Sequence, residues 1–277
     1  MKSDGVYKKT QRTIQKEYND TLQSILRKNR DYLKKVNQVQ SGKIKPPSGL
    51  KTEAQVEAWK RGYLRRYLAK TEAVNKSVKE MQDAGVRVRK SIRDAMNKTY
   101  GIEHGSVVDA LRAGGLMKPP TERQAAILLD GKLQSFDIQA LRNLSNGDVA
   151  RKRLQREFAA SIIKGESDEA VIKRIQKVTG MEESHAKTVL RTERTRVIGM
   201  AQQDATEEYT EKTGRVPKKR WKCMFRNSRE SHVGLHNHVV RADEEFLPGL
   251  AFPGDPRAPA RETVNCQCHM EVFDDDE

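Results

Sequence analysis

The change of composition at Gly214 constrains the fold of this chain more than any other feature. Before it, apolar side chains recur at the three- and four-residue spacing of amphipathic helices. After it lie five of the nine prolines, at positions 217, 248, 253, 256 and 259, and prolines this frequent exclude long helices. Two segments there, Val216 to Phe225 and Val239 to Phe246, predict short strands. We therefore expect an α+β protein: a mostly α-helical, elongated N-terminal region and a small β-containing C-terminal module packed on a long helix.

Helical periodicity before Gly214 is interrupted by segments that favour breaks. The clearest is Ser41 to Thr52, which contains two glycines and two prolines and predicts a linker. Apolar stripes and capping residues predict helices on either side of it and further along the chain. The expected helices cover residues 6–39, 52–83, 86–100, 122–129, 150–163, 168–178 and 182 to just before 214.

Charge divides the chain unevenly. Residues 1–100 contain 25 Lys and Arg against 10 Asp and Glu, whereas residues 101–277 contain 28 of each. The whole excess of +15 therefore lies in the N-terminal third, as is typical of a chain with an arm that binds a polyanion. We expect three segments: a basic helical arm (1–100), a helical middle region (101–180) and a C-terminal module (181–277).

In the basic arm, tyrosine and tryptophan alternate with lysine and arginine, which favours contact with nucleic acid. No helix contains a motif that reads bases, so binding would be non-specific. The alternative is a solvated basic face around a helical bundle. The candidate DNA-binding residues are Lys8, Lys9, Arg12, Lys16, Lys34, Lys35, Lys60, Arg61, Arg65 and Arg66.

All three cysteines and four of the six histidines lie between Cys223 and His269. An odd, clustered set of cysteines does not suit a secreted disulfide framework, so reduced thiols or metal ligands are expected. Structural Zn(II) needs four soft groups, and Cys266, Cys268 and the adjacent His269, with His232 and Cys223 from another part of the module, are available. The preferred candidates are His232, Cys266 and Cys268, with Cys223 as a fourth. The alternative is a set of reduced cysteines packed in a small hydrophobic core.

Two other groups of polar residues suggest chemistry. His236-Asn237-His238 contains the letters of an HNH nuclease, but contiguous letters favour a turn that leads into Val239. A metal-dependent nuclease using His232, His236 or His238 remains the alternative function. Arg191 and Glu193 are two residues apart on a helix and do not face each other, so one or both should reach the β-containing module. The alternative for that pair is ordinary surface charge.

The order of several motifs along the C-terminal third resembles the Mu F-like minor head proteins of tailed phages. The resemblance covers roughly residues 182–272. It rests on Arg191-Thr192-Glu193, Gly199, Tyr209, Gly214, Trp221, Arg229-x-Ser231-His232, Phe246, Pro253-Gly254-Asp255-Pro256 and Asn265-Cys266-x-Cys268.

The resemblance implies a minor component of the virion that acts in head morphogenesis or genome delivery and is not an enzyme. Its implied partners are the portal protein, the major capsid or scaffold protein and double-stranded DNA. It would be assembled in the host cytoplasm and located inside the capsid, and no apolar run approaches the ~20 residues of a membrane span. Arg191, Glu193, Trp221 and Arg229 would hold the module together. Thr263 stands near a position where relatives often carry histidine, so a four-ligand zinc site does not transfer intact.

Overall fold

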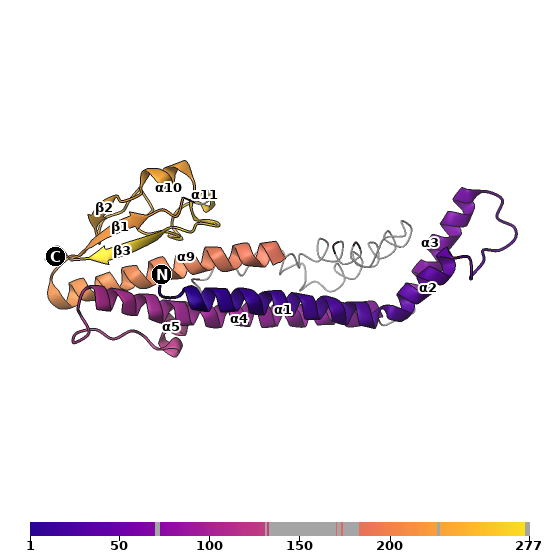
Figure 1. The fold of residues 1–277 in the computed structure, drawn as a ribbon, viewed down its shortest axis with the longest axis horizontal. Helices are drawn as coiled ribbons and strands as arrows, with labels where there is room; N and C mark the ends of the chain where they lie inside the picture. The colour runs from indigo at the N-terminus through magenta and orange to yellow at the C-terminus, as the bar shows by residue number, and fades with distance from the viewer. Residues whose placement is uncertain are drawn as a thin grey trace. The chain divides into compact units, whose positions relative to one another are not determined.

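A computed structural model describes residues 1–69, 73–130, 132, 170, 173, 183–225 and 228–274. It contains long helices and a three-stranded antiparallel sheet near the C-terminus, which confirms the predicted α+β class (Figure 1). Among these residues, no helix is both long and apolar enough to cross a membrane. The elements are α1 (Asp4–Lys28), α2 (Arg30–Gln40), α3 (Glu53–Ala69), α4 (Ala73–Ala110), α5 (Glu122–Leu128), α9 (Glu183–Thr213), β1 (Lys218–Lys222), α10 (Glu230–Gly234), β2 (Val239–Arg241), α11 (Ala260–Thr263) and β3 (His269–Phe273).

The first predicted helix is in fact two helices, α1 and α2, because the chain turns at Asn29. The buried Asn29 amide donates hydrogen bonds to the Ile25 carbonyl at 2.7 Å and to the Ser77 hydroxyl at 2.8 Å. These bonds hold a polar residue inside the core and fix the turn, so the prediction of one uninterrupted helix was wrong. The linker after α2 is confirmed.

Helix α4 runs without a break through the predicted boundary between Asp83 and Val86. Its apolar face continues at Met81, Ala84, Val88 and Ile92, all of which are buried. This continuous burial outweighs the low helix propensity of Gly85, and the predicted break was wrong. Helices α5 and α9 agree closely with expectation, and α9 ends before Gly214 as predicted.

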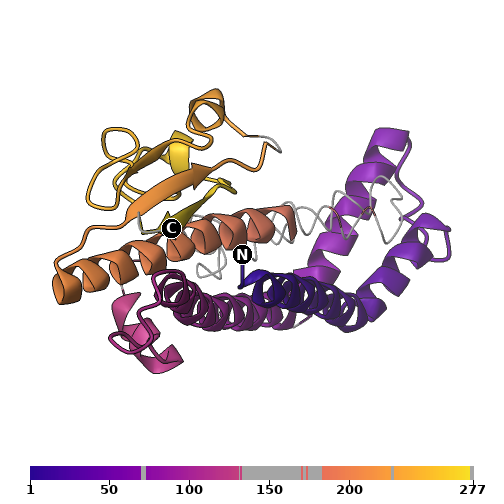
Figure 2. The same cartoon turned by 60° about the vertical axis from the view of Figure 1, so that its left-hand side comes forward.

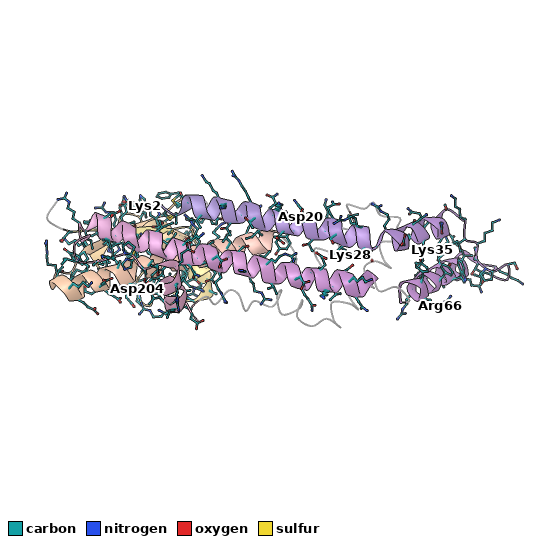
Figure 3. The ribbon with its side chains drawn as sticks, turned by 90° about the horizontal axis from the view of Figure 1, so that it is seen from below. Lys2, Asp20, Lys28, Lys35, Arg66 and Asp204 are labelled. Atoms are coloured by element: carbon teal, nitrogen blue, oxygen red, sulfur yellow. The ribbon has the colours of Figure 1, made fainter. Side chains whose placement is uncertain are left out.

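The chain divides into two compact units, which we describe separately. The second unit consists, among the described residues, chiefly of Ile14–Val88. Its core is formed by aliphatic residues of α1, α2, α3 and α4, against which the rings of Trp59, Tyr63 and Tyr67 pack. Trp59 and Tyr63 stack with their centroids 5.2 Å apart. These aromatic side chains, expected to alternate with basic residues in DNA contact, therefore serve the core as well. Figure 3 shows Lys35 on α2 and Arg66 on α3 in this unit.

The first unit combines Met1–Thr13 with the described parts of Arg89–Phe136 and Ala186–Glu277. Its sheet has the order β2-β1-β3, with Trp221 paired to Met270 and Lys219 to Val272. The sheet lies along α9 in both views (Figures 1 and 2). The buried residues of the two elements are largely apolar, with Val197, Ala201 and Ala205 of α9 and Trp221 of β1 fully or almost fully buried. The buried Lys219 of β1 also donates to the Gln203 side chain of α9 at 3.2 Å. The boundaries 1–100, 101–180 and 181–277 stay a prediction about sequence segments.

The strand predictions were right in place but too long. The run from 216 to 225 contains β1, whereas the run from 239 to 246 forms only the three residues of β2. The chain turns after Arg241, whose guanidinium pairs with Asp243 at 2.9 Å. Strand β3 was not predicted. The helices expected over 150–163 and 168–178 lie outside the described residues, apart from residues 170 and 173.

Candidate metal centre

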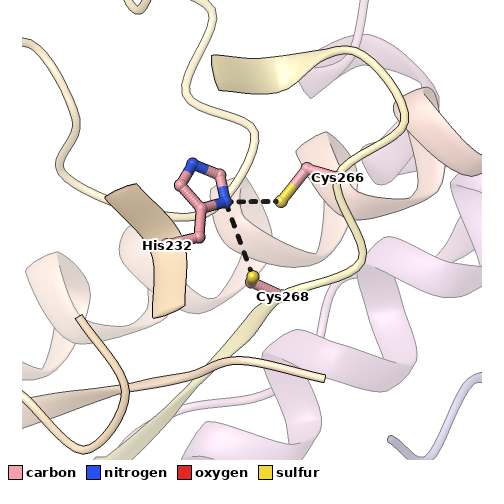
Figure 4. Close-up of side chains that lie close together, drawn as sticks. All are labelled: His232, Cys266 and Cys268. Carbon is pink, nitrogen blue, oxygen red and sulfur yellow. Dashed lines mark hydrogen bonds between the residues drawn. The ribbon is translucent and has the colours of Figure 1, made fainter. Parts of the chain in front are cut away.

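Three buried side chains of the first unit bring metal-binding atoms together. His232 comes from α10, and Cys266 and Cys268 come from the segment between α11 and β3. Their ligand atoms all lie within 4.8 Å of one another. The Nδ1 atom of His232 is 3.5 Å from Cys266 Sγ and 3.6 Å from Cys268 Sγ, so both sulfurs face the same ring nitrogen (Figure 4).

Local backbone structure explains why the two cysteines point the same way. Asn265 adopts a left-handed conformation with φ 61°, which turns the chain after α11. Cys266 and Cys268 are buried while Gln267 between them is half-buried, the alternation that is typical of residues two apart that share a face. The Cys-x-Cys spacing, which is shorter than the usual Cys-x-x-Cys, is suited to this geometry.

Helix α9 holds this turn from the other side. The Thr192 hydroxyl accepts a hydrogen bond from the Asn265 backbone N–H at 2.9 Å, and the Thr195 hydroxyl donates to the Cys266 carbonyl at 2.6 Å. The Arg191 guanidinium donates to the Asn265 side-chain oxygen. Arg191 thus contacts the module across 74 residues of sequence, which positions the cysteine segment on the long helix.

Two neighbouring residues contact His232, one at its Nε2 atom and one at its ring. Its Nε2 lies 3.1 Å from a carboxylate oxygen of Glu262, which also accepts a hydrogen bond from Ser231 at 3.0 Å. The ring of Trp221 packs edge-on against His232 with the centroids 5.1 Å apart. A carboxylate beside Nε2 favours the tautomer in which Nδ1 is free to bind a metal.

The two thiols influence each other's ionisation. Cys266 accepts a hydrogen bond from Cys268, and this bond lowers the pKa of Cys266 while it raises the pKa of Cys268. Of the two thiols, Cys266 is therefore the one that loses its proton more readily. The thiolate is the form of cysteine that binds metals.

The separations of these atoms fit a tetrahedral zinc ion. With Zn–S bonds of about 2.3 Å and Zn–N bonds of about 2.0–2.1 Å, tetrahedral angles place nitrogen and sulfur roughly 3.6 Å apart. The separations in the structure are 3.5 and 3.6 Å. Two sulfurs and one imidazole are also the soft donors that zinc prefers. The residues present could therefore hold zinc through three protein ligands.

Cys223, the predicted fourth ligand, lies outside this cluster. The cluster of potential ligands within the described residues contains His232, Cys266 and Cys268 alone. Cys223 is buried, and its sulfur accepts a hydrogen bond from the Phe225 N–H at 3.5 Å. Of the four candidate ligands, the structure thus brings three together.

Two of the three histidines of the nuclease alternative, His236 and His238, lie in or beside a turn that follows α10. Asn237 is left-handed, with φ 66°, and its N–H donates to the Trp221 carbonyl at 2.8 Å. His236 accepts a hydrogen bond from the Cys223 N–H at 3.2 Å. In the part of the chain that the structure describes, neither His236 nor His238 belongs to a group of three potential metal ligands. The predicted turn into β2 is confirmed.

The comparisons with known proteins match the region that contains this centre. Residues 152–271 match the family model described as phage Mu protein F like protein. This segment of the chain is therefore similar to the phage Mu protein F like proteins. An 82-residue match to the uncharacterized protein YqbB of Bacillus subtilis (strain 168) is 37% identical and covers 27% of each protein. The chain thus spans about a quarter of that relative's length, and no solved structure matches.

Two glycines of the Mu F-like motif series allow a loop to approach α9 closely. A Cβ atom on Gly199 would lie 2.7 Å from the Pro253 carbonyl oxygen, and one on Gly254 would lie 2.8 Å from the Arg196 nitrogen. Gly254 also has a φ of +82°, which L side chains rarely adopt. Asp255 is buried in the same loop and accepts hydrogen bonds from the Ala251 N–H and the Arg257 guanidinium.

The remaining residues predicted to hold the Mu F-like module are also buried or bonded. Glu193 is fully buried and pairs with Arg196, one turn along α9, at 3.0 Å. The Arg229 guanidinium donates to the Val264 carbonyl, two residues before Cys266. Thr195 and Glu262 were not predicted. Thr195 contacts Cys266 and Glu262 contacts His232, and in each pair the two residues are roughly 30 or more positions apart. The sequence carries no signal for such pairs.

Most of the candidate DNA-binding residues are exposed on α1, α2 and α3, where they remain available to a partner. Two have contacts of their own. Lys35 lies over the Tyr67 ring at 5.6 Å, and Lys60 pairs with Glu57 at 2.8 Å.

Proposed function

We propose that this chain is a minor head protein of a tailed phage that joins the portal and capsid during head morphogenesis. The similarity of residues 152–271 to the phage Mu protein F like family carries the proposal. In it the Mu F-like module is a docking unit for the portal, major capsid or scaffold protein. The protein acts as a structural component and is located inside the virion.

The contacts within the module support a docking role. Hydrogen bonds from Arg191, Thr192 and Thr195 fasten the turn at Asn265 to α9. On the other side of the centre, Ser231 and His232 both contact Glu262. A small module tied at several points presents a rigid surface to a partner, which lowers the entropic cost of binding.

We further propose that a structural Zn(II) ion, held by His232, Cys266 and Cys268, stabilises this module. A bound ion of this kind cross-links α10 to the segment before β3 and adds its binding free energy to folding. The support is the burial of the three groups and the match of their separations to tetrahedral zinc.

The basic arm is proposed to contact packaged double-stranded DNA without sequence preference and to act in genome delivery. The excess charge of the chain lies in residues 1–100, and packaged DNA is a polyanion at very high local concentration. Phosphate contacts need no base readout, which agrees with a basic surface that lacks a base-reading motif.

Quantitative mass spectrometry of purified particles before and after DNA release tests the proposal. We expect a few copies of the protein per full particle and fewer after release. Cross-linking of full particles should recover the Mu F-like module attached to portal or capsid peptides. Absence of the protein from particles that are otherwise complete would refute the virion role, and unchanged copy number after release would refute ejection with the genome.

A further inference from the structure

A basic groove lies along α1 and α2 in the second unit. The proposed role of the arm does not by itself say where on the arm DNA would bind. Its walls come from the last turns of α1, from α2 and from the loop that follows. Four cationic side chains line it: Arg27, Arg30, Lys34 and Lys43. Among the described residues, no carboxylate lines the groove, and the other lining groups are mostly amides and a hydroxyl.

The cations of the groove repeat at helical spacing on one face. Arg27, Arg30 and Lys34 are separated by three and four residues, and the polar lining residues Gln23 and Asn37 extend the same stripe in both directions. The stripe continues from α1 into α2, since residues of both helices line the same groove. The turn between the helices is fixed by the bonds of Asn29 to Ile25 and Ser77. At 1.5 Å per residue, Arg27 and Lys34 are about 10 Å apart along the helices.

Contacts within the described residues leave these four cations available to a ligand. All four are exposed, and none has an ion-pair partner among the residues that the structure describes. Their neighbours differ: Lys28 pairs with Glu80, and Lys35 lies over Tyr67 (both lysines are labelled in Figure 3). Residues 24–45 contain seven Lys and Arg and a single Asp, so the local field is strongly positive.

We propose that this groove binds consecutive phosphates of a DNA backbone, with Arg27, Arg30 and Lys34 as the principal contacts and Lys43 closing one end. The inference rests on the proposed contact between the arm and DNA, and it assigns that contact to the groove. Guanidinium groups bind phosphate oxygens in bidentate fashion, and amide and hydroxyl groups can donate to phosphate and sugar oxygens. A row of cations about 10 Å long on a fixed helical turn matches a strand with a charge every 3.4 Å of axis better than a single compact anion.

The test measures binding of the full-length protein to a fluorescein-labelled duplex of random sequence, by anisotropy over a series of salt concentrations. The groove variant carries Arg27→Gln, Arg30→Gln and Lys34→Gln. The control variant carries Lys79→Gln, Arg89→Gln and Lys90→Gln, which are exposed on α4, do not line the groove and remove the same charge. Glutamine has nearly the same helix propensity as lysine and arginine, so both variants should fold, as circular dichroism can check.

We expect the groove variant to bind at least about tenfold more weakly, and the slope of its salt dependence to flatten by about 0.9 for each phosphate that it no longer neutralises. The control variant should behave much like the wild type. Equal weakening of the two variants would overturn the groove, because it would show a general effect of net charge.

Two further comparisons distinguish a failure of this inference from a failure of the proposed function. If the wild type binds DNA, the groove variant binds equally well and a variant with Lys8, Lys9, Arg12 and Lys16 changed to Gln is weakened, the groove is wrong but the proposed DNA contact stands. If the wild type does not bind DNA, both are wrong. If the groove variant no longer binds a fluorescent polyglutamate peptide but still binds the duplex, the inference is overturned in favour of an acidic protein partner.

Discussion

Gly199 of α9 lies directly against Phe252: a Cβ atom on Gly199 would stand 2.4 Å from the Phe252 ring. Because the Pro253 carbonyl oxygen would also lie 2.7 Å from that atom, the loop cannot give way by a side-chain rotation alone. The Mu F-like module therefore needs a glycine here for close packing of the loop on the helix.

Substitution Gly199→Ala should lower the free energy of unfolding by about 2 kcal/mol, the usual cost of overpacking a filled core. Urea denaturation followed by circular dichroism measures the change. Gly5→Ala is the matched control, since Gly5 is also helical but has open space around its Cα. That control should be neutral or slightly stabilising. Equal stability of Gly199→Ala and wild type would contradict the close approach.

Substitution Cys266→Ser should remove bound zinc from the purified protein and lower its melting temperature, because the protein then lacks a metal-binding thiolate. Elemental analysis by mass spectrometry and thermal unfolding measure the two effects. Cys223→Ser should keep its zinc, since Cys223 lies outside the cluster of ligands. A wild-type protein that is folded but free of metal would end the zinc proposal, and release of zinc from Cys223→Ser would return Cys223 to the ligand set.

Substitution Glu262→Gln should weaken zinc binding by about 10- to 100-fold without abolishing it, because the carboxylate orients His232 from its second nitrogen. Competition with a chelator of known affinity measures the change. Glu230→Gln provides a control, since Glu230 is exposed on the same short helix as His232. Similar affinities for both variants would show that Glu262 does not position the ligand.

Lys219 predicts a pH dependence of stability. Its side chain is fully buried in β1, donates to the Ala242 carbonyl at 2.9 Å, and has its pKa lowered to about 8 by burial. Between that value and the unfolded pKa of about 10.4, the unfolded chain binds more protons, so this residue makes stability rise with pH. From about pH 7.5 to about pH 9.5 its contribution should increase by roughly 2 kcal/mol.

The measurement is denaturant unfolding at those two pH values for wild type and Lys219→Met. The variant should lack the rise assigned to Lys219, so the difference in stability between the two proteins should change with pH. A difference that is the same at both pH values would show that the lysine titrates as it does in the unfolded chain.

The spacing of apolar residues and the positions of proline and glycine predicted most of the fold. The helices around the 41–52 linker, the end of α9 before Gly214 and the change to short strands all follow from spacing, proline and glycine. The turn at Asn29 could not be predicted, because it depends on a bond to Ser77, 48 residues away. The unbroken α4 was missed because tertiary burial of its apolar face outweighed the local signal of Gly85.

The candidate centre was predictable in its donors but not in its surroundings. Soft ligands crowded into one segment pointed to His232, Cys266 and Cys268, and the structure brings these three together. The turn after Trp221 places the side chain of Cys223 outside the cluster, and helix α11 places the side chain of Glu262 beside His232. Such placements are set by long-range packing, for which a single sequence gives no spacing rule.

The antiparallel pairing of α1 with α4 has a consequence for how such a chain can vary. Contacts along this pairing follow antiparallel order. Ser3, just before α1, bonds to Glu103, and within α1 Glu17 pairs with Arg87 and Lys28 pairs with Glu80. Removal of two helical turns from each partner would preserve which faces meet, because about seven residues return a helix nearly to the same face. Paired insertions or deletions of this length in α1 and α4 would therefore keep their buried faces in register, so the lengths of the two helices can vary together without any change to the Mu F-like module.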